Sequence, residues 1–179
     1  MQDNTNGQYL EIIEECKEIF IKKTKDYGTS WRVYRTISIA DQIYIKARRI
    51  RTIQEKRSQR VVDNVMAEFS GIINYAVIGL IQLSLTDDEP EEMEVDKVER
   101  LYTEKTTTAM KLMQDKNHDY GEAWREMSQE SFVDLILSKL LRIRKILQND
   151  GKTIISEGID ANYYDILNYA VFALILFPG

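Results

Sequence analysis

The strongest constraint on this chain is that it repeats itself. When the sequence is laid over itself with a shift of 93 residues, Asp26-Tyr27-Gly28 matches Asp119-Tyr120-Gly121. After one further inserted residue, Asn74-Tyr75-Ala76 matches Asn168-Tyr169-Ala170. So many identities in register indicate an internal duplication. Other identical pairs are Lys23 and Lys116, Trp31 and Trp124, Asp41 and Asp134, Lys46 and Lys139, and Arg49 and Arg142.

Each copy is predicted to contain three main helices. The first covers about 8–25 in one copy and 98–118 in the other, and a glycine, Gly28 or Gly121, ends it. The second begins near Ser38 or Ser131, which we expect as N-caps. The third covers about 62–85 and 162–176, where almost continuous apolar residues predict contact on all sides.

These elements predict an all-α fold, an internally duplicated helical bundle in which two pseudo-twofold related units pack as one body. The predicted boundaries are 1–85 for the first unit, 86–100 for an acidic linker and 101–179 for the second unit. The contents of 44% hydrophobic and 30% charged residues are typical of a globular protein. The apolar runs 71–85 and 166–177 fall short of the roughly 20 residues that span a bilayer, so no membrane is expected.

Charge and cysteine content narrow the expected surroundings of the protein. A net charge of −5 disfavours nucleic acid as the main partner, although 46–60 is locally basic. The single cysteine, Cys16, cannot form an internal disulfide, and no leader segment is evident, so the cytoplasm is expected. The sequence leaves self-association open.

The first helix carries a run of four glutamates. Glu14 and Glu18 lie opposite the apolar face and are expected in solvent, whereas Glu11 lies nearer its boundary. The same helical wheel places Lys23 and Asp26 on the apolar side, where buried charges need partners. Two explanations stay open, which are pairing with each other and a shared functional site.

The other helices add cations and carboxylates. Lys46 and Arg49, repeated as Lys139 and Arg142, suit phosphate oxygens, although an ordinary salt-bridged surface is an equal alternative. Asn74 and Asn168 interrupt apolar helices, and they can bind a ligand or clamp two helices together. The acidic residues upstream are Asp63 and Glu68 in the first copy, where Gly71 stands one turn before the asparagine, and Glu157 and Asp165 in the second.

Aromatic and histidine residues complete the candidate set. Trp31 and Trp124 can stack on a base, although filling the core is the more common role of aromatics at helical spacing. The single histidine, His118, has no counterpart in the first copy, which argues against histidine-centred metal or triad chemistry. The chain contains no Gly-rich phosphate loop and no Ser or Cys nucleophile motif.

The combination of Lys, Asp-Tyr-Gly and Trp, followed by Asp, Lys, Arg and Asn-Tyr-Ala, resembles the nucleotide-modification-associated domain family of the first type. The resemblance covers about 8–85 and 101–177. The family pattern has a Glu and two Asp before Asn-Tyr-Ala, of which the second copy matches two with Glu157 and Asp165. In the first copy Asp63 stands in for the Glu, and Gly71 replaces the last Asp. The layout is also similar to all-helical nucleoside triphosphate pyrophosphohydrolases, whose carboxylates hold magnesium.

The resemblance implies a metal-dependent hydrolase that cleaves the α–β phosphoanhydride of a nucleoside triphosphate or a related pterin triphosphate. Asp165, Glu157 and Asp119, with Asp26 and Glu11 from the first copy, would hold Mg²⁺ or Mn²⁺. Lys116, Lys139 and Arg142 would neutralise phosphate charge, and Asn168 would orient the ligand. The first copy would contribute its equivalents Lys23, Lys46, Arg49, Asn74 and Asp63.

Two other functions compete with hydrolysis. One is a non-catalytic nucleotide-binding or regulatory module, and the other is a helical scaffold whose twinned polar residues lock the units together. Under the hydrolase hypothesis, the aspartate of Asp-Tyr-Gly, the second-helix lysine and the third-helix asparagine should converge on one pocket in each unit. The second unit, with Asp165, should have the fuller set of metal ligands.

Overall fold

The computed structural model describes residues 2–57, 64–153 and 157–179, which form an all-helical bundle. In the first unit, α1 spans Gln2–Tyr27, α2 spans Thr36–Lys56 and α3 spans Val65–Ser84. In the second unit, α4 spans Val95–Tyr120, α5 spans Gln129–Gln148 and α6 spans Ile159–Leu176. A short 3₁₀ helix follows the first helix of each unit, with η1 at Ser30–Val33 and η2 at Ala123–Glu126. The predicted all-α class is confirmed.

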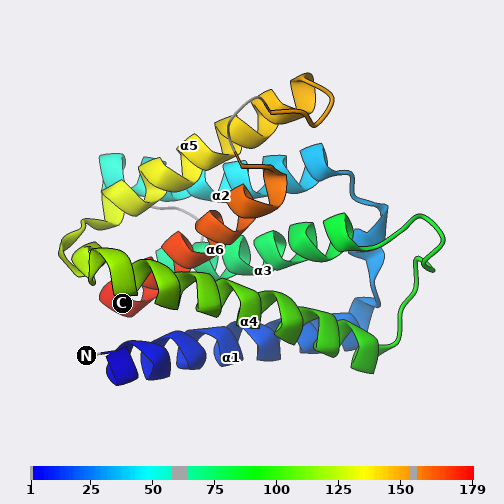
Figure 1. Cartoon of the computed structure of the whole chain (residues 1–179), viewed down its shortest axis with the longest axis horizontal. Coiled ribbons are helices and arrows are strands. Elements are labelled where there is room, and N and C mark those ends of the chain that lie inside the picture. Colours follow the sequence, from blue (N-terminus) through cyan, green and yellow to red (C-terminus); the bar gives the residue numbers. More distant parts are fainter. Residues whose placement is uncertain (1, 58–63, 154–156) are drawn as a thin grey trace.

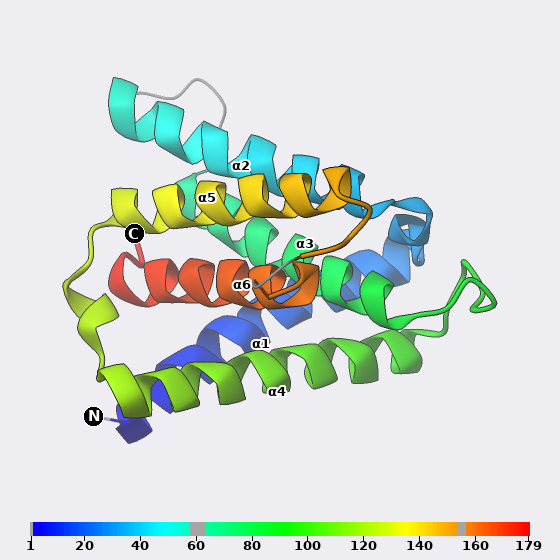
Figure 2. The same ribbon diagram turned by 45° about the horizontal axis from the view of Figure 1, so that its top comes forward.

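The helices lie in three layers, each with one helix from either unit (Figures 1 and 2). α3 and α6 form the middle layer, α2 and α5 cover one side of it, and α1 and α4 cover the other. Each helix therefore packs against its own counterpart as well as against the middle layer. This arrangement is the predicted internally duplicated bundle with pseudo-twofold symmetry.

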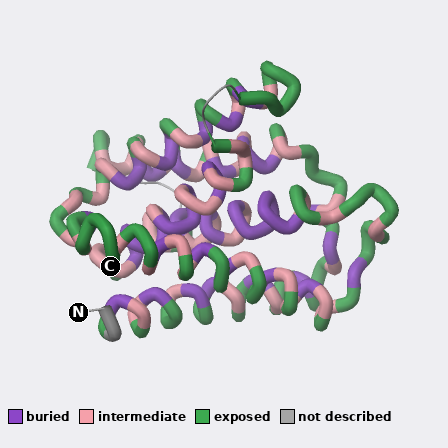
Figure 3. The backbone as a smooth tube through the Cα atoms, in the orientation of Figure 1, coloured by how far each residue is buried: buried purple, intermediate pink, exposed green. Residues whose placement is uncertain are grey.

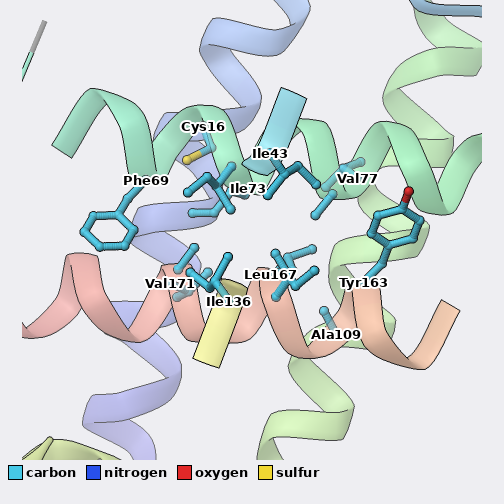
Figure 4. Close-up of a cluster of buried hydrophobic side chains, with 14 of the residues drawn as sticks. Cys16, Ile43, Phe69, Ile73, Val77, Ala109, Ile136, Tyr163, Leu167 and Val171 are labelled. Atoms are coloured by element: carbon cyan, nitrogen blue, oxygen red, sulfur yellow. The ribbon is translucent and has the colours of Figure 1, made fainter. Parts of the chain in front are cut away.

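The core lies along the middle layer, where the backbone is mostly buried (Figure 3). The buried side chains form pairs that are equivalent in the two units. Ile73 and Val77 of α3 lie opposite Leu167 and Val171 of α6 (Figure 4). By length and composition alone, α3 could cross a membrane, but more than half of its apolar stretch is buried inside the bundle. Further equivalent pairs in this cluster are Phe69 and Tyr163, Ile43 and Ile136, and Cys16 and Ala109.

The helix ends follow part of the sequence prediction. Gly28 and Gly121 have φ of +66° and +68°, a left-handed conformation that glycine adopts without strain, and each follows the last residue of α1 or α4. The predicted N-caps are wrong. α2 is capped by the backbone at Arg35, and α5 is capped by Ser128, whose hydroxyl accepts a hydrogen bond from the Ser131 amide at 3.1 Å. α2 and α5 therefore begin at Thr36 and Gln129, each before the predicted N-cap.

Both middle-layer asparagines make inter-helix hydrogen bonds that exchange partners between the units. The Tyr102 hydroxyl of α4 donates to Asn74 Oδ1 at 2.8 Å, and the Tyr9 hydroxyl of α1 donates to Asn168 Oδ1 at 2.6 Å. Asn74 and Asn168 in turn donate to the carbonyls of Cys16 and Ala109, both at 3.1 Å. Each asparagine thus ties together a helix of its own unit and a helix of the other. These bonds support the clamp alternative for Asn74 and Asn168.

The outer layer uses the same exchange with charged groups. Arg51 of α2 pairs with Asp134 of α5 at 2.7 Å, and Arg144 of α5 pairs with Asp41 of α2 at 2.9 Å. All four side chains are partly solvent-exposed, so each pair contributes modestly to stability, at about 1 kcal/mol or less. The repeated Asp41 and Asp134 therefore join the two units.

The short helices η1 and η2 are covered by different parts of the chain. The segment that joins α3 to α4 lies over η1, where Met93 is buried and its amide donates to the Thr29 hydroxyl at 3.0 Å. At the other end, the start of α1 lies over η2, where Arg125 Nη2 donates to Thr5 and Gln8, both at 2.7 Å. The chain between the units is therefore packed against the first unit.

Replacing Tyr9 with phenylalanine should destabilise the fold. The change removes a buried hydroxyl and leaves Asn168 Oδ1 without its donor, and an unsatisfied buried polar group costs about 1–3 kcal/mol. We expect the free energy of unfolding, measured by urea denaturation, to fall by about that amount. The control is Tyr27→Phe, at a side chain that is 73% exposed, which should change it by less than about 0.5 kcal/mol. Equal effects of the two substitutions would contradict the role of this bond.

Candidate ligand-binding site

The first unit contains a pocket of about 460 Å³ where the end of α1, η1, α2 and α3 meet. Its basic residues are Lys23 from the last turns of α1 and Lys46 from α2. Its aromatic lining includes Trp31 from η1, Tyr34 after η1 and Tyr75 from α3. Cations and aromatic rings from four elements therefore face one cavity. The same cavity is lined by Tyr27, Gly28, Glu68, Gly71, Asn74 and Ile78.

The deepest charge in this pocket is the carboxylate of Glu68, whose side chain is 9% exposed. Arg49 Nη1 lies 2.6 Å from Glu68 Oε1, and Lys46 Nζ lies 3.6 Å from Glu68 Oε2. Buried carboxylates need such partners because an unpaired buried charge is costly. Lys23 also lines this pocket, so its lining has two cations, Lys23 and Lys46, for one carboxylate.

Gly71 leaves the space that the Lys46 side chain occupies in this arrangement. A Cβ atom at Gly71 would lie 2.9 Å from Lys46 Cε, closer than real Cβ contacts allow. The lysine side chain therefore passes directly over the backbone of α3 to reach Glu68, one turn earlier on the helix. Its ammonium lies 5.9 Å from the centre of the Tyr75 ring, a cation–π distance.

In the second unit the equivalent lysine also pairs with a carboxylate, which lies one turn later on the third helix. Asp165 occupies the position equivalent to Gly71, and it accepts Lys116 Nζ on Oδ1 at 2.7 Å and Lys139 Nζ on Oδ2 at 2.8 Å. The position equivalent to Glu68 is Asn162, which donates to the Gly158 carbonyl at 2.8 Å. The lysine of the second helix thus meets a carboxylate in both units, although that carboxylate comes from different turns.

The two lysines determine the ionisation of Asp165. Burial acts to raise the pKa of this carboxyl, but the hydrogen bonds and charges of Lys116 and Lys139 outweigh burial and hold the pKa below its ordinary value. For Lys116, burial acts to lower the pKa, and the bond to Asp165 outweighs it and raises the pKa. Asp165 and Lys116 are therefore both ionised at neutral pH.

The second-unit pocket is smaller, with a volume of about 180 Å³. The Trp124 ring stacks on the Phe172 ring, with centroids 4.1 Å apart and an interplanar angle of 7°. In the first unit the residue equivalent to Phe172 is Ile78, and Trp31 instead contacts Phe20 with ring centroids 6.2 Å apart. Both tryptophans are 7% exposed, so filling the core is their main role, while each also lines its pocket.

Comparison with protein families matches Nucleotide modification associated domain 1 twice, over residues 23–83 and 116–177. The chain belongs to this family. The two matched segments coincide with the repeated units, which confirms the resemblance inferred from the Asp-Tyr-Gly and Asn-Tyr-Ala motifs. Comparisons with curated proteins and with solved structures give no match. The similarity to nucleoside triphosphate pyrophosphohydrolases stays a prediction.

The family's repeated residues do not all converge. The predicted lysine and asparagine meet at each pocket, because Lys46 and Asn74 line the first and Asn168 lines the second beside the Lys139–Asp165 pair. The aspartates of Asp-Tyr-Gly line neither pocket and are exposed. Asp119 contacts only its neighbour His118, at 3.1 Å, among the bonds of the described residues.

The prediction that Lys23 and Asp26 lie on a buried apolar side is wrong, because both are exposed at the end of α1. The buried face of α1 instead follows Tyr9, Ile13, Cys16, Phe20 and Thr24, whereas Ile19, which the helical wheel places on the apolar face, is 45% exposed. Lys23 still lines the pocket edge, whereas Asp26 does not. Glu11, Glu14 and Glu18 are exposed, as expected for the polar face of α1.

The carboxylates predicted to bind magnesium are dispersed. Both oxygens of Asp165 already accept lysine ammonium groups, while Glu157, Asp119, Asp26 and Glu11 are exposed. Within 2–57, 64–153 and 157–179, no three Asp, Glu, His or Cys side chains are grouped to hold an ion. These residues do not fit a magnesium site in this arrangement, and the metal site stays a prediction. Asp63 lies outside the described residues.

Sequence reasoning noted Glu68 and Gly71 but did not see how they compensate for each other. The signal was available, because positions 68, 71 and 74 are spaced by one helical turn and therefore share a face of α3. Arg49 pairs with Glu68 on that face. The equivalent Arg142 is exposed. Its charge acts to lower the pKa of the nearby Tyr169 phenol, against the larger effect of burial, which raises it.

Replacing Asp165 with asparagine should destabilise the protein in a pH-dependent way. At pH 7 we expect the free energy of unfolding to fall by about 1.5–3 kcal/mol, because hydrogen bonds to charged groups are lost. The pKa of Asp165 is lowered on folding, so its contribution is present above its unfolded value near pH 4 and is lost as the pH falls below that.

The measurement is urea denaturation of wild type and Asp165→Asn between pH 7 and pH 3. The difference in unfolding free energy should stay constant down to about pH 5 and then narrow. Asp115→Asn is the control, because this aspartate is largely exposed and pairs with Lys111 on the same helix. A difference that persists unchanged at pH 3 would show that the charge of Asp165 is not what stabilises the cluster.

Proposed function

We propose that this member of the family binds a phosphorylated nucleotide, or a similar phosphorylated heterocycle, in the first-unit pocket. The observation that carries the proposal is the meeting of excess positive charge with aromatic side chains in one cavity of about 460 Å³. That volume lies within the range of about 300–1,000 Å³ that is common for small-molecule sites. The family description supports association with nucleotides and names no reaction.

The cations suit the phosphate part of such a ligand. Lys23 and Lys46 line the cavity, and Arg49 adjoins it through Glu68. Ammonium and guanidinium groups bind phosphate oxygens through charge-assisted hydrogen bonds. Because Lys46 lies 3.6 Å from Glu68, a phosphate can draw this flexible side chain away while Arg49 keeps the carboxylate paired at 2.6 Å.

The aromatic residues suit the heterocyclic part. Trp31, Tyr34 and Tyr75 line the same cavity as the lysines. Rings of this kind stack on nucleobases without requiring a particular base. Burial together with a hydrogen bond to Tyr34 raises the pKa of Tyr75. The Tyr75 hydroxyl therefore stays protonated at neutral pH and can donate a hydrogen bond.

The scaffold alternative explains fewer of the repeated residues. Locking the two units together accounts for Asn74, Asn168, Asp41 and Asp134, all of which bond to the opposite unit. It does not account for Lys23, which is repeated as Lys116 but lies at the pocket edge, away from the contacts between units. Binding of an anion gives this lysine a role.

Hydrolysis of the α–β phosphoanhydride is the enzymatic extension of this proposal. It rests on the sequence resemblance and requires carboxylates that can hold a metal ion. Since Asp165 and Glu68 are both paired with cations, binding is the function that the geometry favours. Release of pyrophosphate from nucleoside triphosphates in the presence of Mg²⁺ is the assay that separates the two.

Substituting Lys46 with methionine should weaken nucleotide binding. The change keeps the length of the side chain but removes one phosphate-binding charge, so we expect the dissociation constant to rise by at least about tenfold. The measurement is isothermal titration with ATP, GTP, CTP and UTP, with and without Mg²⁺, supported by thermal melting.

The matched control is Lys22→Met, at an exposed lysine that pairs with Glu18 on the outer face of α1. This variant should bind like wild type. If none of the four nucleotides raises the melting temperature of the wild-type protein, the proposed binding function is wrong.

A further inference from the structure

We infer that the second unit is filled by its own side chains, so that each chain takes one nucleotide, in the first unit only. Phe172 occupies the place of a ligand ring, and Asp165 occupies the place of a ligand anion. This inference rests on the proposed function. It also assigns the class of ligand, which must carry both a flat ring and a negative charge.

The first argument is the ring contact in the second unit. Trp124 and Phe172 are nearly parallel at 7°, with ring centroids 4.1 Å apart, which is the geometry of a stacked aromatic pair. In the first unit the ring of Phe172 is replaced by the aliphatic side chain of Ile78, which lines the open pocket with Trp31. The pocket is correspondingly larger, at about 460 Å³ against about 180 Å³.

The second argument is the state of the equivalent lysines. In the second unit Asp165 binds Lys116 at 2.7 Å and Lys139 at 2.8 Å, so both phosphate-binding candidates already have a carboxylate partner. In the first unit Glu68 reaches Lys46 and Arg49, but no ion pair to Lys23 occurs among the described residues. The first unit therefore retains a cation for a ligand.

The third argument is that both changes affect the same face of the third helix. Gly71 and Ile78 in α3 correspond to Asp165 and Phe172 in α6, seven residues or about two helical turns apart. Both members of each pair line their respective pockets. A carboxylate and a ring at these two positions are thus present together in α6 and absent together from α3, whose carboxylate, Glu68, lies one turn earlier. This is expected if Asp165 and Phe172 take the places of two parts of one ligand.

The inference predicts which probes bind. A nucleoside triphosphate has both the ring and the charge, whereas ribose 5-phosphate lacks the ring. Because stacking of one base on an aromatic side chain changes affinity by about tenfold to a hundredfold, ribose 5-phosphate should bind at least about tenfold more weakly than the best of ATP, GTP, CTP and UTP.

The decisive measurement is the stoichiometry of isothermal titration with those four nucleotides. Wild type should bind one nucleotide per chain. Ile78→Phe places a ring in the first pocket and should abolish binding. The double substitution Asp165→Gly with Phe172→Ile gives the second unit the residues of the first, and it should raise the stoichiometry to two.

The outcomes separate this inference from the function beneath it. Two nucleotides bound per wild-type chain would overturn the inference and keep the proposed function. Unchanged binding by Ile78→Phe would also overturn the inference. No binding by wild type would overturn both. If the double variant does not fold, as judged by circular dichroism, the wild-type stoichiometry and Ile78→Phe still decide the question.

Discussion

The organisation of this protein depends on two inward-facing amides, one buried and one partly buried, whose oxygens accept hydrogen bonds from the opposite unit. Asn74 and Asn168 each accept a tyrosine hydroxyl from the opposite unit, at 2.8 Å and 2.6 Å. Removing either hydroxyl would leave its amide oxygen without that donor inside the fold, at a cost of about 1–3 kcal/mol. Tyr9 must therefore reach α6 while Tyr102 reaches α3, which places α1 and α4 on the same side of the middle layer.

The same constraint positions the two pockets. Each asparagine that bonds to the other unit also lines the cavity of its own unit, so the depth of the cavity is set by the joint between units. Lys46 and Tyr75 line the same cavity from α2 and α3, next to the asparagine that is held by these hydrogen bonds. A change at the interface between units is in this way a change at the binding site, and the reverse also holds.

The sequence predicted the elements of the fold better than their partners. Duplication, helix number, helix ends at Gly28 and Gly121, and the inward position of the asparagines are all visible in one chain, because they depend on periodicity and local conformation. The hydroxyls that bond to the asparagines are not. Tyr9 and Tyr102 are 93 residues apart and repeat in register, but nothing local indicates that each crosses to the other unit.

The candidate site was predicted in part for a related reason. Lys46 and Lys139 were found by repetition, yet their carboxylate partners lie on different turns, at Glu68 in one unit and Asp165 in the other. In the alignment of the two units, Gly71 looks like the loss of the carboxylate found at Asp165. In the structure, Gly71 leaves the space through which Lys46 reaches Glu68. Asp26 was misplaced because the apolar residues of α1 do not all face the core, since Ile19 is exposed whereas Thr24 is buried.

The connection between α3 and α4 packs against the first unit through buried Met93, whose amide bonds to Thr29. This covalent link between the units affects how their sequences can diverge in evolution. In a symmetric dimer of identical single units, every substitution appears twice, and a ring that fills one cavity fills both. A chain that carries its own partner is free of that rule. Both units can keep the tyrosine–asparagine hydrogen bonds that join them, while a phenylalanine or an aspartate arises in the cavity of only one unit. Covalent fusion thus allows the two units, which would have to be identical in a homodimer, to change in sequence independently.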